Sequence, residues 1–526
     1  MGPKPRLDPY MKLLCRFYEP LILLRILGKT RGEHTSSPWD ATPEQLKRRR
    51  LLRNLSYLCD YDKGGDTTTS IALEENEERF VFWVASNTAR TGARVLRFLK
   101  PILSKIYHII RLEGEQRNGP EQEFIRTCIT FAERRVKKEI KMLSSAVTRC
   151  KRYLNNENPE AESKLVAWLD QFRPKRGRSI VDVCSLAYDQ RKAPEMRWLE
   201  GEIQTHDGEV RPSERVLAFE SVHHFLGRLA HHVRAPTEVI KDSSSLLRLF
   251  DVYDVRLVRP IDSSPRPQGD SLTTLPSILK RMLPANDPKL KEYEENIRSL
   301  DQKFHITERI HQKYEDKNFQ SQIHAEIQVL EYFHTNNINF VNDDKYIGCS
   351  KPACYCCHLY FQHHQARPVV PESHQNIYPN WGVPALPNGA KDAGYEQQRN
   401  LMNKMLHTIR QDALSQIQRK AGPLRWHADS RTGITMSTMT PSLDLEHSRK
   451  HSPERELIAL DAESALSEGI SNLELQSHSL EASSMSSLED DTDSIDSANS
   501  VREPHNEAMP EFDSKSDSDS TGGCAL

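Results

Sequence analysis

The sequence lacks any long uninterrupted run of apolar residues. The most apolar stretch near its start, residues 21–24, ends at Arg25. No later stretch approaches the ~20 uncharged apolar residues that a membrane-spanning helix needs. Lipid-attachment signals are missing too, because Pro3 and Arg6 disrupt a myristoylation pattern and only two residues follow Cys524, where prenylation needs three. We therefore expect an intracellular protein, cytoplasmic or nuclear and not secreted, with no membrane partner.

Apolar residues are scarce overall, at 37%, against 28% charged residues. The shortage is greatest at residues 451–526, which hold 18 Asp and Glu, three Lys and Arg, 17 Ser and one aromatic residue, Phe512. Such a composition cannot bury enough apolar surface to fold, which predicts a disordered, acidic, Ser-rich tail over 423–526. Because residues 451–526 carry a net charge of −15 and the whole chain −2, the first 450 residues carry +13. A basic body favours polyanions such as nucleic acids as partners.

Cysteine is too sparse and too unevenly placed for an extracellular disulfide framework. There are ten cysteines in 526 residues, and four of them fall within nine positions, at Cys349, Cys354, Cys356 and Cys357. A cluster of this kind is typical of a metal site.

The length of 526 residues allows two to four globular units, and no internal repeat of fixed period is present. Two Thr-rich or aromatic runs, Thr67–Glu75 and Arg79–Asn87, predict a β-hairpin. Apolar residues spaced by threes and fours predict one long helix over 121–154 and further helices at 323–335 and 353–364.

These patterns predict a domain order. A basic helical lead-in at 1–66 is followed by the hairpin at 67–87. A mainly helical insertion or separate helical domain occupies 88–318 and contains a Pro-rich loop at 260–288, and a zinc-binding core occupies 319–422.

The chemistry is concentrated in two short motifs. His324 and Glu326 lie two residues apart at the start of one predicted helix. Cys354 and Cys357 lie at positions i and i+3 of the next helix, so their sulfurs share one face, whereas Cys356 points elsewhere. One imidazole and two thiolates suit zinc and leave a fourth position for water. The carboxylate of Glu326 could then move the proton of that water.

These motifs resemble the H-x-E and P-C-x-x-C signature of the zinc-dependent nucleoside and nucleic-acid deaminase superfamily. The stretches 323–328 (IHAEIQ) and 346–355 (YIGCSKPACY) resemble a little-characterised fungal, deaminase-like branch. The resemblance implies an α/β fold, with a mixed five-stranded sheet flanked by helices and the hairpin as its first two strands. It also implies that His324, Cys354 and Cys357 bind zinc and that Glu326 is the catalytic proton shuttle.

The same resemblance suggests residues of a substrate pocket. Asn87 resembles the polar residue that ends the second strand beside the substrate. His374, Tyr378 and Trp381 follow the second helix, where aromatic faces could grip a base. The implied function is a zinc-dependent hydrolytic deaminase acting on a cytosine or adenine base in a nucleic acid or nucleoside.

Two alternatives stay open. Ala353 separates Pro352 from the cysteine, and Cys349 and Cys356 offer other sulfur ligands. The second interpretation is therefore a closed structural zinc site formed by Cys349, Cys354 and Cys357 with either His324 or a nearby histidine such as His358. The protein would then be a catalytically inactive, zinc-stabilised binding or scaffold protein.

Overall fold

The computed structural model describes seven segments of the chain, residues 8–32, 34–37, 40–154, 159–173, 177–205, 213–317 and 319–420. The predicted acidic tail at 423–526 lies outside them. The described residues form a mixed α/β structure with 15 α-helices and one open sheet. The helices are α1 (Pro9–Leu27), α2 (Pro43–Cys59), α3 (Ala89–Ile109), α4 (Asn118–Phe131), α5 (Glu133–Arg152), α6 (Pro159–Leu169), α7 (Ile180–Asp189), α8 (Pro194–Gln204), α9 (Glu214–Ser245), α10 (Leu275–Met282), α11 (Leu290–Phe304), α12 (Ile306–Glu315), α13 (Ala325–Thr335), α14 (Tyr355–His363) and α15 (Tyr395–Gln418).

The sheet contains four strands in the order β3-β2-β1-β4. The strands are β1 (Thr69–Glu75), β2 (Phe80–Ser86), β3 (Tyr253–Leu257) and β4 (Gly348–Cys349). β1 and β2 form the predicted antiparallel hairpin, β3 pairs in parallel with β2, and β4 pairs antiparallel with β1. The Asn76 side chain closes the hairpin turn by accepting hydrogen bonds from the backbone N–H groups of Glu78 and Arg79.

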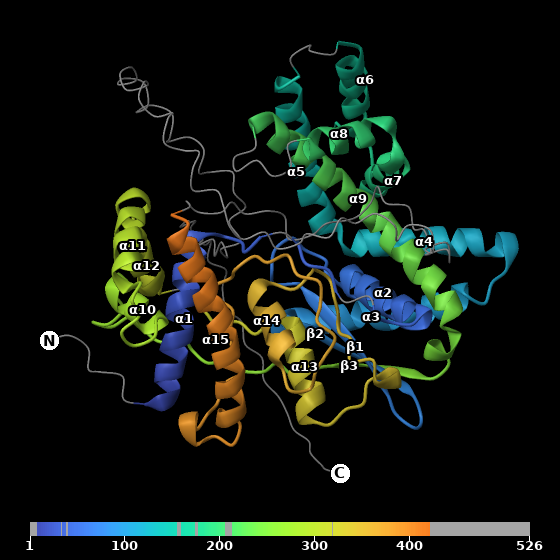
Figure 1. Cartoon of the computed structure of the whole chain (residues 1–526). Helices are drawn as coiled ribbons and strands as arrows, with labels where there is room; N and C mark the ends of the chain where they lie inside the picture. Colours follow the sequence, from blue (N-terminus) through green and yellow to red (C-terminus); the bar gives the residue numbers. More distant parts are fainter. Residues whose placement is uncertain are drawn as a thin grey trace, which may run out of the picture. The chain divides into compact units, whose positions relative to one another are not determined.

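Helices cover both faces of the sheet. Alternate residues of β1 and β2 point to opposite faces, and nearly all of them are buried. Ala72 and Trp83 pack into a core shared with α13, α14, α1 and α15, whereas Ile71 and Phe82 pack into a second core with α2, α3 and α9. Figure 1 shows α13 and α14 in front of the strands and α1 alongside α15.

The prediction of a five-stranded sheet was wrong for the described residues, where the sheet has four strands. After α14 the chain is extended but forms only isolated bridges, such as that between Ala353 and Ser373. Five prolines interrupt this stretch, and proline cannot donate a ladder hydrogen bond. They are Pro368, Pro371, Pro379, Pro384 and Pro387.

The single helix predicted over 121–154 is two helices, α4 and α5. They meet at Ala132, whose backbone angles of φ −87° and ψ 16° break the helical path. With α6 to α9 they form a third hydrophobic core, which includes Val136 and Phe219. The predicted insertion at 88–318 therefore contains a helical core of its own, but it also supplies β3 to the common sheet.

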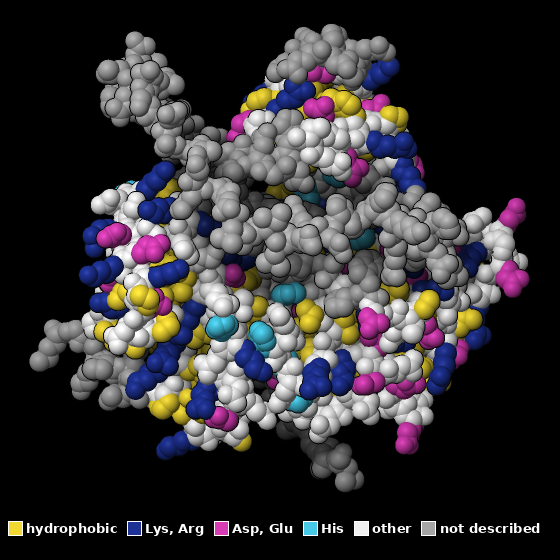
Figure 2. All heavy atoms as spheres, viewed as in Figure 1, with side chains coloured by type: hydrophobic (Ala, Val, Ile, Leu, Met, Phe, Trp, Pro, Cys, Tyr) yellow, Lys and Arg dark blue, Asp and Glu magenta, His cyan; other side chains and the backbone are white. Residues whose placement is uncertain are grey.

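Charged side chains of both signs are spread over the face of the molecule drawn in Figure 2. On the face drawn in Figure 2, Lys and Arg side chains gather over α1 and α15, and several His side chains lie near the middle of the view. Within the described residues, no helix combines the length and the hydrophobicity needed to cross a bilayer.

Candidate metal centre and proton carrier

Two helix N-termini bring the zinc-type ligands together. His324 is the N-cap of α13, with an extended backbone (φ −69°, ψ 151°), and its carbonyl oxygen accepts hydrogen bonds from the backbone N–H groups of Ile327 and Gln328. Cys354 is the N-cap of α14, where its sulfur accepts a hydrogen bond from the Cys357 backbone N–H at 3.4 Å. Helix N-termini stabilise negative charge, so this position favours the thiolate of Cys354.

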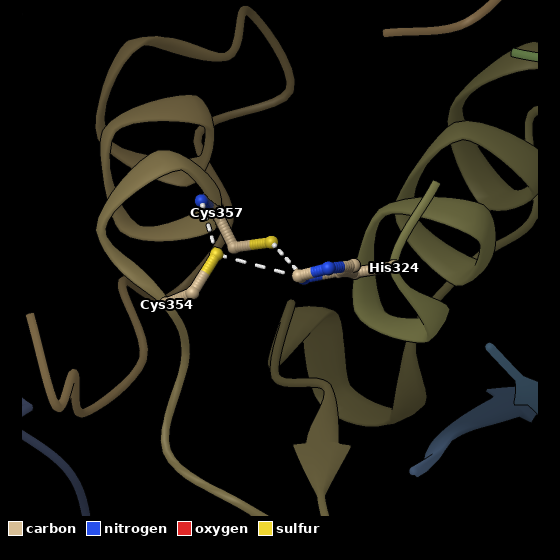
Figure 3. A group of neighbouring side chains, drawn as sticks. All are labelled: His324, Cys354 and Cys357. Atoms are coloured by element: carbon tan, nitrogen blue, oxygen red, sulfur yellow. Dashed lines mark hydrogen bonds between the residues drawn. The ribbon is translucent and has the colours of Figure 1, made fainter. Parts of the chain in front are cut away.

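The three side chains converge on one point, as Figure 3 shows. The Nδ1 atom of His324 lies 3.5 Å from the Cys354 sulfur and 3.3 Å from the Cys357 sulfur. All three candidate ligand atoms lie within 4.8 Å of one another. Tetrahedral zinc, with bonds of about 2.3 Å to sulfur and about 2.0 Å to nitrogen, separates these atoms by about 3.5 Å. The donor set and the two nitrogen–sulfur distances therefore fit a zinc ion.

Glu326 lies in the first turn of α13 and turns its carboxylate toward this cluster. Its side chain is only 4% exposed and hydrogen bonds the Cys357 side chain. Burial raises the pKa of Glu326, the His324 charge opposes that shift, and the Cys354 thiolate adds to it. A buried carboxyl group with a raised pKa is suited to taking up and releasing a proton near neutral pH.

The two cysteines and the histidine are electrostatically coupled. Burial alone would lower the pKa of His324, but the Cys354 thiolate and the Glu326 carboxylate together raise it to about 9. Burial likewise disfavours the Cys354 thiolate, yet hydrogen bonds from Cys357 and His324 hold the pKa of Cys354 well below its usual range. The pKa of Cys357 moves the other way, because burial and the neighbouring Cys354 thiolate both raise it.

The other two cysteines of the cluster stand apart from these ligands. Cys356, on α14, is fully buried in the hydrophobic core. Cys349, on β4, lies with its sulfur 4.0 Å from the Glu326 Oε2 atom. Neither sulfur belongs to the His324, Cys354 and Cys357 group that the described residues bring within ligand distance.

The Trp381 side chain is buried and contacts the candidate ligand Cys357. The side chain is 0% exposed, and its indole Nε1–H donates a hydrogen bond to the Cys357 sulfur at 3.2 Å. Its ring packs against Phe17 and Tyr360. The structure therefore gives Trp381 a contact with a candidate metal ligand, where the sequence had suggested the wall of a substrate pocket.

Asn87 joins the end of β2 to the start of α13. Its Oδ1 atom accepts a hydrogen bond from the Ala325 backbone N–H at 2.8 Å, and its Nδ2 group donates to the Gly65 carbonyl at 2.8 Å. The Gln322 side chain donates to the Asn87 carbonyl at 2.9 Å. These contacts place Asn87 beside His324 and let it cap α13.

The aromatic side chains of His374 and Tyr378 lie beside the candidate ligand His324. The Tyr378 ring lies edge-on to the His324 ring, with 6.1 Å between centroids, and 5.8 Å from the His374 ring. The backbone of this segment is held to α14, since His374 N–H donates to the Ala353 carbonyl. Both rings are thus near the metal centre, with Tyr378 the less buried of the two.

A buried polar network next to the site was not predicted from the sequence. Asp60, at the end of α2, accepts hydrogen bonds from the hydroxyls of Thr67 and Ser350 and pairs with Arg135 of α5 at 3.2 Å. Ser350 in turn accepts from the Thr69 backbone N–H. No local pattern marks Asp60, because two of its three partners, Arg135 and Ser350, come from distant parts of the chain.

Gly348 marks the close approach of α2 to β4, next to Cys349. A Cβ atom there would lie 2.5 Å from the Leu52 backbone carbon and 2.7 Å from the Arg53 nitrogen. Only glycine fits between the two backbones, and Ser56 of α2 donates a hydrogen bond to the Gly348 carbonyl.

Comparison with known families gives one match. Residues 323–385 match the family model described as "OTT_1508_deam:-like deaminase". This segment contains His324, Glu326, Cys354 and Cys357, and it includes both stretches, 323–328 and 346–355, that carry the resemblance in the sequence. No curated protein and no solved structure matches the chain. The match supports a deaminase-type function for this segment, and the cluster is compatible with a metal site.

Proposed function

We propose that the protein is a zinc-dependent hydrolytic deaminase that acts on a cytosine or adenine base of a nucleic acid or nucleoside. The observation that carries the proposal is the position of Glu326. Its buried carboxyl group faces the His324, Cys354 and Cys357 cluster, which is the arrangement that proton transfer beside a metal centre requires.

In this proposal His324, Cys354 and Cys357 hold the zinc. When bound, zinc supplies a Lewis acid that lowers the pKa of a water to about 7. The chain's own residues tune the site. The Trp381 indole hydrogen bond stabilises negative charge on the Cys357 sulfur, and the N-terminus of α14 does the same for Cys354.

Glu326 moves the protons. Its raised pKa lets the carboxylate accept one proton from water and release it to the ring nitrogen, and then carry the second proton of that water to the amine, which leaves as ammonia. Tyr378, next to His324, offers an aromatic face against which the base can rest during this transfer. The closer assignment to a fungal branch of the superfamily rests on the sequence stretches alone and stays a prediction.

One observation favours the second interpretation, a zinc-stabilised binding protein without activity. The Glu326 carboxyl group already has protein partners, the Cys349 thiol at 4.0 Å and the Cys357 side chain, and it is almost fully buried. A carboxyl group satisfied in this way could serve stability alone.

Metal content and ammonia release separate the two functions. We expect about one zinc per chain in the wild type and in Glu326→Gln, with deamination lowered by roughly 10²–10⁴-fold in the variant. Glu331→Gln is the matched control, because Glu331 lies on the same helix but accepts hydrogen bonds from Tyr360 and His364. The substrates are cytidine, adenosine and single-stranded oligonucleotides. Full zinc occupancy with no ammonia from any of them would favour the binding protein.

A further inference from the structure

Helix α3 carries positive charge without any acidic residue. Its 21 residues include five Lys and Arg and no Asp or Glu. Arg90, Arg94, Arg97 and Lys105 are separated by one or two helical turns, so they follow one face of the helix. This α3 stripe starts at the end of the helix that adjoins the candidate metal centre.

Several basic side chains of α5, in contrast, are paired with acidic residues. Lys137 pairs with Glu133 at 2.7 Å, and Lys138 pairs with Asp62 at 2.8 Å. Among the residues that the structure describes, Arg90 is the one member of the α3 stripe with an acidic partner, Asp66 at 3.3 Å, and that pair is exposed and hence weak. The α3 stripe thus keeps a local excess of positive charge beside the groove described below, whereas part of the positive charge of α5 is paired.

A groove of about 330 Å³ lies between α3 and α4, beside the stripe. Phe98, Pro101 and Phe131 form its apolar part, with the two phenylalanine rings stacked at 3.7 Å and 5°. Its cations are Arg94, Arg97 and Lys105, and no acidic side chain lines it. Arg94 also lies over the Tyr61 ring at 4.1 Å, which fixes its guanidinium at the groove.

The groove is a short distance from the candidate active site along one helix. The Asn87 side chain caps α13 beside His324, and α3 begins two residues later. Phe98 follows Asn87 by eleven residues, about 16 Å at 1.5 Å per residue. Stacked nucleotides spaced by about 3.4 Å would cover that distance with about five residues.

We propose that the α3 stripe and its groove bind the single-stranded nucleic acid that flanks the reacting base. The inference rests on the proposed function and deepens it, because it makes a polymer the substrate. Arg97 and Lys105 meet the phosphates. Phe131, which is partly exposed and packs between Phe98 and Arg94, forms with Pro101 the apolar surface against which a base rests. Cations beside aromatic faces are the combination that single-strand binding uses.

Binding is measured apart from turnover, in the Glu326→Gln background, by fluorescence anisotropy with a labelled 20-nucleotide single strand. Reversing two charges, Arg97→Glu with Lys105→Glu, should weaken binding at least tenfold and reduce the slope of log affinity against log salt by about 1.4, since each lost phosphate contact removes about 0.7. Phe131→Ala should weaken binding roughly tenfold and leave the salt slope unchanged.

The matched control reverses two exposed charges on α5, Arg134→Glu with Lys141→Glu, and should change affinity less than threefold. Equal losses in the two double variants, or no loss in either, would overturn the inference. So would polyglutamate displacing the oligonucleotide at equal charge, because the groove would then bind acidic protein.

The outcomes also separate this inference from the proposed function. If a nucleoside and an oligonucleotide are deaminated equally well by the wild type and by Arg97→Glu with Lys105→Glu, the enzyme stands and the groove fails. If the oligonucleotide binds through the groove but the wild type releases no ammonia from it, the binding surface stands and the deaminase proposal fails.

Discussion

Glu139 and Glu326 are both buried glutamates, yet their surroundings shift their pKa values in opposite directions. Glu139 is 0% exposed in the helical region and accepts hydrogen bonds from Arg135 at 3.2 Å, Arg228 at 3.0 Å and His232 at 2.9 Å. Burial by itself would raise the pKa of Glu139, but Arg228, His232 and Arg135 together hold it well below its usual range. Glu139 is therefore a fixed carboxylate.

Glu326 has only His324 as an opposing charge, and burial and the Cys354 thiolate raise its pKa. The comparison teaches that burial does not decide the protonation state; the balance of neighbouring charge does. In the Glu139 cluster, Arg135 and Arg228 form ion pairs with the carboxylates of Glu139 and Asp60, so the charges of these four side chains balance. The Glu326 site gathers two cysteine sulfurs and a carboxyl group around one imidazole, a set with room for a cation.

The largest expected effect, and the most direct test of the difference between the two sites, is loss of metal from the candidate site. We expect His324→Ala and Cys357→Ala each to reduce zinc from about one equivalent to near zero, because structural zinc sites gain about 10–16 kcal/mol from a complete ligand set. Mass spectrometry of purified protein measures this. Cys356→Ala, in the adjacent buried position, should keep its zinc. If Cys349→Ala loses as much zinc as Cys357→Ala, the site is closed by a fourth protein ligand.

The two glutamates should also differ in what they do for stability. Glu139→Gln should lower the free energy of unfolding by about 3–5 kcal/mol, since it removes the buried carboxylate that Arg228 and Arg135 share and leaves Arg135 with Asp60. Glu326→Gln should change it little, because that carboxyl group carries less stabilising charge interaction. Urea unfolding of both zinc-loaded variants compares them. A larger loss in Glu326→Gln would reverse the assignment of the two roles.

The stabilisation from Glu139 should depend on pH with a defined sign. Its pKa is lower in the folded state than in the unfolded state, so its contribution is present above the usual glutamate pKa and is lost as pH falls through the lowered folded pKa. The stability difference between wild type and Glu139→Gln should therefore be constant near neutral pH and shrink below pH 4.5. Glu308→Gln, on the exposed side of α12, serves as the control. A difference that grows in acid would contradict the carboxylate assignment.

Trp381 tests whether the hydrogen bond to a ligand sulfur tunes the metal centre. Trp381→Phe keeps an aromatic ring but removes the N–H donor to Cys357, and we expect zinc affinity to fall about 10–100-fold. Competition with a chelator measures the affinity. Trp168→Phe removes an equivalent donor, to Gln190 in the helical region, and should leave zinc affinity unchanged. Equal effects of both substitutions would point to general loss of packing.

The smallest effect is expected at Asn87. Asn87→Ala removes the cap on α13 and should cost about 0.5–2 kcal/mol of stability, whereas Asn87→Asp keeps the acceptor for the Ala325 N–H. Thermal unfolding compares the two. Loss of activity in Asn87→Ala with unchanged stability would instead support the substrate contact expected from the sequence.

Local features of the fold were predictable from the sequence. The hairpin was predictable, because β-branched and aromatic residues fill both strands and Asn76 fixes the turn between them. β3 was not predictable, since Tyr253–Leu257 is short and its charged residues Asp254 and Arg256 alternate with apolar ones. Its pairing with β2 is what makes it a strand. β4 is shorter still, because residues 345–347 are a loop and the strand consists of Gly348 and Cys349 alone.

The candidate site divides in the same way. His324, Glu326, Cys354 and Cys357 could be grouped from spacing alone, because each pair begins a helix whose geometry is regular. The contact between Trp381 and Cys357 depends on the course of a Pro-rich segment without regular structure, so no pattern foretold it. Contacts between distant segments, such as Asp60 with Ser350, lie beyond any local signal.

The order of strands along the chain affects how the protein can fold during synthesis. Thr69, at the start of β1, bonds to Ser350, 281 residues later, just after β4. At about 5–20 residues per second, ribosomes need about 14–56 s to make the intervening chain. During that interval the edge of β1 has no partner strand, and such an edge can pair with other chains. We expect the nascent hairpin to depend on α2, made just before it and packed across the same strands, or on a chaperone, until the last strand leaves the ribosome.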